Sequence, residues 1–288
     1  MPSSQTDDLV RILMIGDVMG RPGRNALKNL VPGLRKEYGL DLVIANSENA
    51  AGGIGLTPET ALEMMDAGVD VLTSGNHIWQ HKEIVPVMED GNLPLLRPLN
   101  YPPDAPGRGH LFNGKCMVIN LVGRTFMGPL DCPFRTVDAL LNGLGNKTPR
   151  VVIVDFHAEA TSEKAALGWF LAGRASAVLG THTHVGTIDM RILPGGTAYV
   201  TDVGMTGPVD SIIGVEVEPV LQRFITSLPH QLPIGKGKVA LDAVLVEVDE
   251  ATPRPLRKPS KTPAMLRCSR SSRTRAVASE ESPPRTLP

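Results

Sequence analysis

The 288-residue sequence has few cysteines, few aromatic residues and no long uncharged apolar run. Cys116, Cys132 and Cys268 are odd in number and lack metal-type spacing, which argues against a disulfide framework or a zinc ribbon and fits a reducing compartment. Residues 1–8 lack the basic and apolar regions of a signal peptide, and no apolar run reaches membrane-spanning length. We therefore expect a soluble, cytoplasmic protein without a membrane partner.

Common nucleotide-binding motifs are also missing. The Gly-rich segment 50–55 follows a short apolar run, but it has neither the Gly-Lys-Ser/Thr end of a P-loop nor the GxGxxG spacing of a dinucleotide-binding turn. Its glycines instead allow the backbone to come close to whatever the neighbouring polar cluster holds.

The net charge of −1 combines two unlike segments. Residues 251–288 carry nine Lys or Arg against two Glu, a net charge of +7, which leaves −8 for residues 1–250. An acidic body does not bind nucleic acid strongly through bulk charge, so local positive centres such as metal ions must hold an anionic substrate. The composition predicts one domain over residues 1–250 and a disordered, basic Pro/Ser/Arg-rich tail over residues 251–288.

Five short apolar runs predict buried strands, and each is followed by a polar cluster. The runs are 9–15, 42–45, 69–72, 151–154 and 175–179, and helical spacing falls between them at 24–38, 60–67 and 163–172. This alternation predicts an α/β fold. The clusters supply these candidate site residues: Asp17, Glu48, Asn49, Asn76, His77, His157, His182 and His184.

These side chains are expected to meet in one cleft, because reactive groups in an open α/β sheet collect beyond the carboxyl ends of the strands. Their mix of carboxylate, amide and imidazole groups is too large for one tetrahedral zinc and suits a pair of manganese, iron or similar ions. His182 and His184 are two apart, so on an extended segment both imidazoles would face the same side. Any one histidine alone is more often a structural residue, but the joint placement favours a dinuclear site.

A second histidine pair has a different interpretation. His77 and His81 are four apart and would share a face on a helix, yet the His-Glu-x-x-His signature is absent. We expect His77 on the loop after Gly75 and His81 as a solvated helix residue. Arg124 is interpreted as a surface arginine, with an anion contact as the alternative.

With these motifs the chain resembles the calcineurin-like metallophosphoesterases, whose ordered signature is Gly-Asp, Gly-Asn-His, a lone His after a strand, and Gly-His-x-His or a variant. The closer resemblance is to the YmdB-like family, over about residues 9–248. It is carried by these segments: 15–18 together with 21–24, 47–53, 155–164 and 180–185. Met19 replaces the usual His after the first Asp and Glu48 replaces the bridging Asp, and the YmdB-like pattern shares both departures.

The resemblance implies a four-layer α/β/β/α metallophosphoesterase sandwich that hydrolyses phosphodiesters, with 2′,3′-cyclic nucleotides as the expected substrate. It also implies two divalent or mixed-valence transition-metal ions per chain, most readily iron or manganese. One ion is expected on Asp17, Glu48, Asn49 and His184, and the other on Glu48, Asn76, His157 and His182. His77 is left outside both sets and is predicted to be the catalytic proton donor.

Two other functions stay open at this point: a metal-binding nucleotide sensor or regulatory protein with little turnover, and a phosphomonoesterase. The sequence leaves the oligomeric state open, including a homo-oligomer. It also does not identify the native metal or the preferred base.

Overall fold

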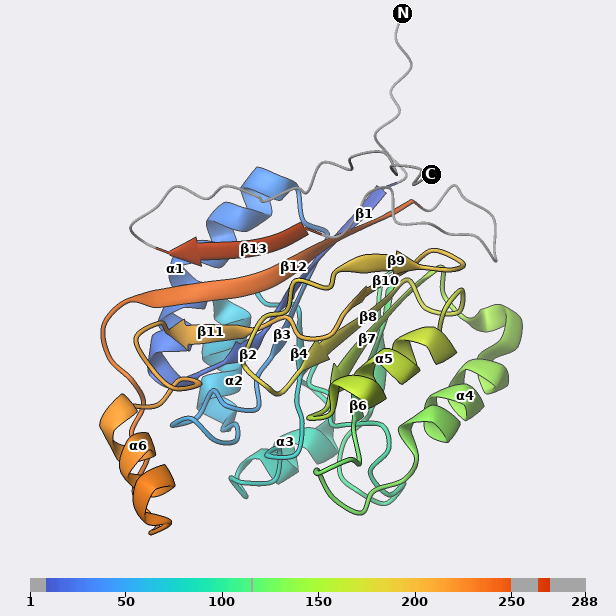
Figure 1. The fold of residues 1–288 in the computed structure, drawn as a ribbon. Helices are drawn as coiled ribbons and strands as arrows, with labels where there is room; N and C mark the ends of the chain where they lie inside the picture. The colour runs from blue at the N-terminus through green and yellow to red at the C-terminus, as the bar shows by residue number, and fades with distance from the viewer. Residues whose placement is uncertain (1–8, 115, 250–263, 270–288) are drawn as a thin grey trace, which may run out of the picture.

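The computed structural model describes residues 9–114, 116–249 and 264–269, which form two packed sheets (Figure 1). The first sheet has the strand order β2-β11-β12-β1-β3-β4, with β13 paired to β12. Its strands are β1 Leu9–Ile15, β2 Asp17–Val18, β3 Leu42–Asn46, β4 Val71–Thr73, β11 Met205–Pro208, β12 Val239–Asp249 and β13 Ala264–Ser269. Because β1, β3 and β4 are parallel, their carboxyl ends lie at the same edge of the sheet.

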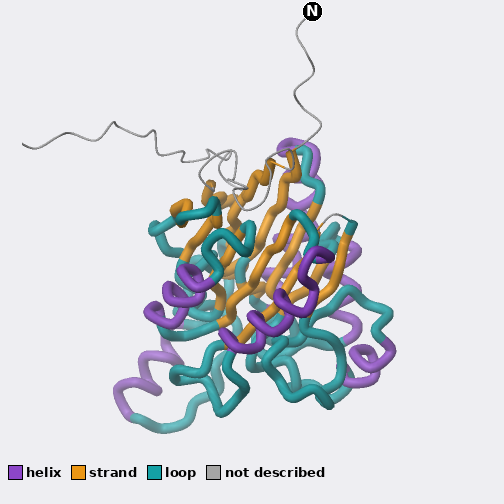
Figure 2. The backbone as a smooth tube through the Cα atoms, turned by 90° about the vertical axis from the view of Figure 1, so that its right-hand side faces the viewer, coloured by secondary structure: helices purple, strands orange, loops and turns teal. Residues whose placement is uncertain are grey.

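The second sheet has the strand order β5-β6-β7-β8-β10-β9. Its strands are β5 His110–Asn113, β6 Cys116–Val122, β7 Val151–His157, β8 Ala177–Thr181, β9 Arg191–Leu193 and β10 Thr197–Val200. The central strands β6, β7, β8 and β10 are parallel. Figure 2 shows loops gathered below the lower ends of the strands of both sheets.

Helices cover the outer face of each sheet, which gives four layers and three apolar cores (Figure 1). Leu27 and Val31 of α1 pack in one core with Leu13 of the first sheet. Val137 of α4 and Leu167 of α5 pack in another core, on the outer face of the second sheet. The third core lies between the sheets. The helices are α1 Gly20–Tyr38, α2 Pro58–Asp66, α3 Ile84–Asp90, α4 Pro133–Leu144, α5 Thr161–Phe170 and α6 Val217–Thr226, with a 3₁₀ turn at Gly145–Lys147.

The predicted α/β/β/α sandwich is confirmed, although some elements differ from expectation. The first helix begins at Gly20 and not at Arg24, because Pro22 falls within the first turn, where a missing N–H costs no helical hydrogen bond. Six residues of the predicted tail, Ala264–Ser269, form β13 antiparallel to β12. For these six the expectation of disorder is wrong, because their backbone completes a ladder along β12. Residues 250–263 and 270–288 lie outside the described residues.

In the part of the chain that the structure describes, none of the helices combines the length and apolar character that a membrane crossing requires.

Candidate metal centre

The structure brings the candidate ligands to one place, at the carboxyl ends of strands from both sheets. Each follows or closes a strand: Asp17 follows β1, Glu48 and Asn49 follow β3, Asn76 follows β4, His157 closes β7, and His182 and His184 follow β8. Asp17, Glu48, Asn49 and His157 are buried. Gly75 permits this approach, since a Cβ there would lie 2.2 Å from His157 Cδ2 and 2.3 Å from Glu48 Oε2.

One group of side chains surrounds His157. Its Nε2 lies 2.8 Å from Glu48 Oε1, 3.2 Å from Asn76 Oδ1 and 2.9 Å from His182 Nδ1. Ligand atoms of Glu48, His157 and His182 all fall within 4.8 Å of one another. Three donors of the nitrogen and oxygen type at this separation are suited to a transition-metal ion.

A second group surrounds Asp17 and His184. His184 Nε2 lies 3.3 Å from Asn49 Oδ1 and 3.9 Å from Asp17 Oδ1. Asp17 Oδ2 accepts a hydrogen bond from the His182 backbone N–H at 3.0 Å. Asp17 Oδ1 is buried and has no hydrogen-bond partner among the described residues. A buried carboxylate oxygen without a donor is costly unless a cation compensates it.

Hydrogen bonds fix which nitrogen of each imidazole faces the cluster. The His157 Nδ1–H donates to Thr181 Oγ1 at 3.0 Å, because the Thr181 hydroxyl itself donates to Asp155 Oδ1 at 2.7 Å. His184 Nδ1 lies 2.9 Å from the Ile213 carbonyl oxygen, which only accepts.

One ring nitrogen of His182 is also held by an oxygen acceptor, on the side of the ring away from His157. Its Nε2 lies 3.3 Å from Glu159 Oε2. Each of the three rings thus has one nitrogen held by an oxygen acceptor and turns the other toward the buried carboxylates. This outer hydrogen bonding is the usual support of metal-ligating histidines.

The charges in this cluster are strongly coupled. Burial would raise the pKa of Glu48, but His157 and the hydrogen bonds from His157 and His77 outweigh it and hold the pKa at about 2. Burial also favours neutral His157, yet Glu48, Asp17 and Asp155 raise its pKa to about 9. Burial, followed by the neighbouring His157, lowers the pKa of His182 to about 3, so its ring is neutral at pH 7. The carboxylates that attract a proton to His157 would equally attract a cation.

The loop that carries His182 and His184 is not the extended segment that the sequence predicted. Both residues have positive φ, 101° for His182 and 65° for His184, and their rings turn to different groups. The expectation that both imidazoles face the same side is therefore wrong, because it assumed that the extended geometry of β8 continues beyond its end at Thr181. Left-handed backbone at two non-glycine residues is unfavourable and is typical of functional sites.

Sequence reasoning missed a buried network beneath His157. Asp155 accepts from Thr181, from the Thr73 hydroxyl and from the Asn46 amide, the last at 3.0 Å. Burial raises the Asp155 pKa to about 6, and these hydrogen bonds lower it only in part. The sequence contains a usable signal, since Asp155 and His157 are two apart directly after the four consecutive β-branched residues Val151–Val154.

A buried ion pair supports the histidine loop from behind. Lys164 Nζ lies 2.7 Å from Asp202 Oδ2, and both side chains are 1% exposed. The same Oδ2 accepts from the Thr183 hydroxyl at 2.9 Å and from its N–H at 3.2 Å, between the two histidines. Sequence reasoning missed Lys164, although a lysine on the packed face of a helix is unusual.

Replacing Lys164 by methionine is expected to lower the free energy of unfolding by about 3–5 kcal/mol, because Asp202 would remain buried without its cation. Urea denaturation followed by circular dichroism measures this. Lys28→Met on the exposed face of α1 is the matched control and should change stability by less than about 0.5 kcal/mol. Equal stability of the two variants would contradict the supporting role.

His77 follows the candidate ligand Asn76 and contacts the cluster in two ways. Its backbone N–H donates to Glu48 Oε2 at 3.0 Å, and its Nε2 lies 3.3 Å from the Asn76 amide nitrogen. Because that amide donates, the neutral His77 ring carries its proton at Nδ1. It lies in a turn, as predicted. His81 is half-buried in a bend, not on a helix, and its Nε2 lies 3.0 Å from the Ile54 carbonyl oxygen.

Comparison with known proteins agrees with this geometry. The family model described as "YmdB-like protein" matches residues 13–257. The chain belongs to the YmdB-like family. It is 50% identical over 248 residues to a Bacillus subtilis protein named 2′,3′-cyclic-nucleotide 2′-phosphodiesterase, covering 84% of this chain and 93% of that one.

Two solved structures are similar to this chain over most of their length. A hypothetical protein from Thermus thermophilus has a TM-score of 0.80 at 46% identity and covers 90% of this chain and 99% of its own. A Mycoplasma pneumoniae protein described as a novel phosphatase has a TM-score of 0.82 at 34% identity, with coverages of 91% and 94%. These matches confirm the predicted family and fold class.

The residues fit the divalent metal ions that this family implies. The fit is seen in the unsatisfied Asp17 Oδ1, in the donor group of Glu48, His157 and His182, and in the outer hydrogen bonds of the three imidazoles.

Proposed function

We propose that this protein is a metal-dependent phosphodiesterase that hydrolyses 2′,3′-cyclic nucleotides. The observation that carries the proposal is the convergence of three fixed imidazole nitrogens on the buried carboxylates Asp17 and Glu48. The name of the Bacillus subtilis relative supports the substrate class.

The ligands divide into two sets that share Glu48. Asp17, Asn49 and His184 would complete one set, and Asn76, His157 and His182 the other. Bound ions of this kind activate water near neutral pH and neutralise charge on phosphoryl oxygens. Two ions per chain, and iron or manganese as their identity, are part of the proposal, as is a cytoplasmic location.

His77 would deliver the proton that the leaving O2′ takes, and the attacking water would replace that proton. Hydrolysis adds water across the P–O2′ bond, so the hydroxyl joins phosphorus, O2′ takes a proton and a 3′-phosphomonoester is released. The Asn76 amide orients the His77 ring with its proton at Nδ1, outside both ligand sets. Glu48 fixes the same residue through the His77 backbone N–H.

A phosphomonoesterase is the second candidate, because the similar Mycoplasma pneumoniae structure is described as a novel phosphatase. Both reactions would use the same side chains, and they differ in which substrate the surrounding surface admits. A sensor with little turnover would keep the ligands without needing the fixed His77 ring.

Substrate selection separates these functions. The metal-reconstituted protein is expected to hydrolyse 2′,3′-cyclic AMP to 3′-AMP, with kcat/KM at least about tenfold above that for 3′-AMP or an aryl phosphomonoester. Chromatography of the products measures both reactions. A preference for monoesters would favour the phosphatase, and metal binding without turnover would favour the sensor.

A further inference from the structure

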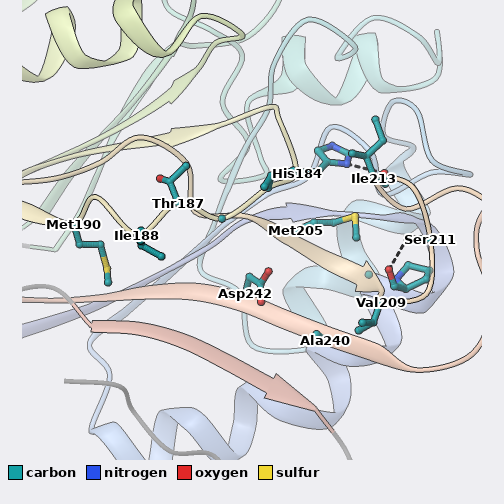
Figure 3. Close-up of a pocket in the computed structure, with 14 residues that line it drawn as sticks. His184, Thr187, Ile188, Met190, Met205, Val209, Ser211, Ile213, Ala240 and Asp242 are labelled. Atoms are coloured by element: carbon teal, nitrogen blue, oxygen red, sulfur yellow. Dashed lines mark hydrogen bonds between the residues drawn. The ribbon is translucent and has the colours of Figure 1, made fainter. Parts of the chain in front are cut away.

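A groove of about 360 Å³ adjoins the candidate metal centre (Figure 3). The segment 184–190 forms one wall, and β11 with the start of β12 forms the other. A cavity of this size is within the range of small-molecule sites.

The groove and the metal centre share His184. Its Nε2 lies 3.3 Å from Asn49 Oδ1 on the ligand side, while its Nδ1 lies 2.9 Å from the carbonyl oxygen of Ile213, another lining residue. Figure 3 shows the imidazole directed toward Ile213 at one end of the groove. The groove therefore begins at His184, where the proposed ligand set ends. One bound molecule can reach both the groove and the metal centre.

The lining is mainly apolar. It includes Ile188, Met190, Met205, Val209 and Ile213, and Ile188 is 99% exposed. Methionine side chains are polarizable and adaptable, and they make favourable sulfur contacts with aromatic rings. A partly exposed apolar surface beside a polar centre suits a flat ring attached to a charged group.

Two hydroxyl groups in the lining already have partners. The Thr187 hydroxyl donates to Asp189 Oδ1 at 2.6 Å and accepts from the Asp202 N–H at 2.9 Å. The Ser211 hydroxyl donates to the Pro208 carbonyl at 2.7 Å and accepts from the Gly214 N–H at 3.0 Å. These two hydroxyls are committed within the protein, so neither is free to form hydrogen bonds with the edge of a bound ring.

We propose that this groove binds the nucleobase of the cyclic nucleotide, by apolar contact with little discrimination among bases. The inference rests on the proposed function, which places the cyclic phosphate at the metal centre. Because the contact is by area, purines are expected to bind somewhat more tightly than pyrimidines.

Kinetics with and without a base test the groove. Ile188→Asp is expected to raise KM for 2′,3′-cyclic AMP about tenfold, equivalent to about 1.4 kcal/mol, with kcat within about twofold. The same variant should leave KM unchanged for methyl riboside 2′,3′-cyclic phosphate, which has the reacting group but no base. Leu62→Asp, at an apolar position of α2 that is 50% exposed, is the control and should leave KM for both substrates unchanged.

Binding without turnover gives an independent measurement. Adenosine, which has no phosphate, is expected to shift the ¹³C-methyl resonances of Met190 and Met205 in the full chain, and Ile188→Asp should weaken that response. An unchanged methyl spectrum, or equal KM increases for the substrates with and without a base, would overturn the groove assignment. Failure of the unaltered protein to hydrolyse either cyclic phosphate would instead contradict the proposed function, while the adenosine titration still tests the groove.

Discussion

Glu48→Gln is expected to lower turnover by more than about 10³-fold and to reduce bound metal below two ions per chain. Glu48 is the side chain that both proposed ligand sets share, and removal of its charge withdraws several kcal/mol of electrostatic stabilisation, with each 1.36 kcal/mol equal to about tenfold in rate. The substitution keeps the shape of a side chain that is 1% exposed. Steady-state kinetics and elemental analysis of the same preparation measure the two effects.

Glu159→Gln provides the comparison for this result. Glu159 contacts the outer nitrogen of His182, at 3.3 Å, and its side chain is 49% exposed. Loss of such an outer contact typically costs about 10- to 100-fold in activity or metal affinity. A Glu48→Gln protein that kept two ions and lost no more than the Glu159→Gln protein would contradict the shared-ligand role.

His77→Ala is expected to keep both metal ions and to lose about 10²- to 10⁴-fold in turnover of 2′,3′-cyclic nucleotides, the usual contribution of a positioned proton donor. The loss should be much smaller for a bis-aryl phosphodiester, because an aryl oxide of low pKa leaves without protonation. Steady-state kinetics on the two substrates measures this contrast.

His182→Ala is the matched variant for His77→Ala. His182 Nδ1 lies 2.9 Å from His157 Nε2 within the ligand group, so its loss should reduce metal occupancy and slow both substrates alike. Equal losses for good and poor leaving groups in a fully metallated His77→Ala protein would mean that His77 orients phosphate or water and that another group donates the proton.

Much of the architecture was predictable because the apolar runs are short and each is followed by polar residues. The runs at 9–15, 42–45, 151–154 and 175–179 correspond to β1, β3, β7 and β8, and the third run ends in β4. Parallel strands place such clusters at one edge of each sheet. Asp17 follows β1 of the first sheet and His184 follows β8 of the second, so their approach to 3.9 Å also requires the two sheets to pack against each other. Three helices of the described residues, α3, α4 and α6, were not expected.

The sequence-based predictions that were wrong concern features that depend on contacts between residues far apart in the sequence. The φ values of His182 and His184 cannot be deduced from their spacing, because Asp202 and Lys164 hold that loop from 18 or more residues away in sequence. Strand β13 was missed for a similar reason. The low apolar content of the tail predicts no independent core, whereas a strand added to β12 needs only backbone pairing.

A dinuclear centre that shares Glu48 is tested most directly by anomalous X-ray diffraction from crystals of the protein grown without chelators. Data collected on either side of the iron and manganese absorption edges should show two anomalous peaks per chain, one on each side of the Glu48 carboxylate, with His184 beside one and His157 and His182 beside the other. A single peak, or two peaks of which one lies away from Glu48, would contradict the account.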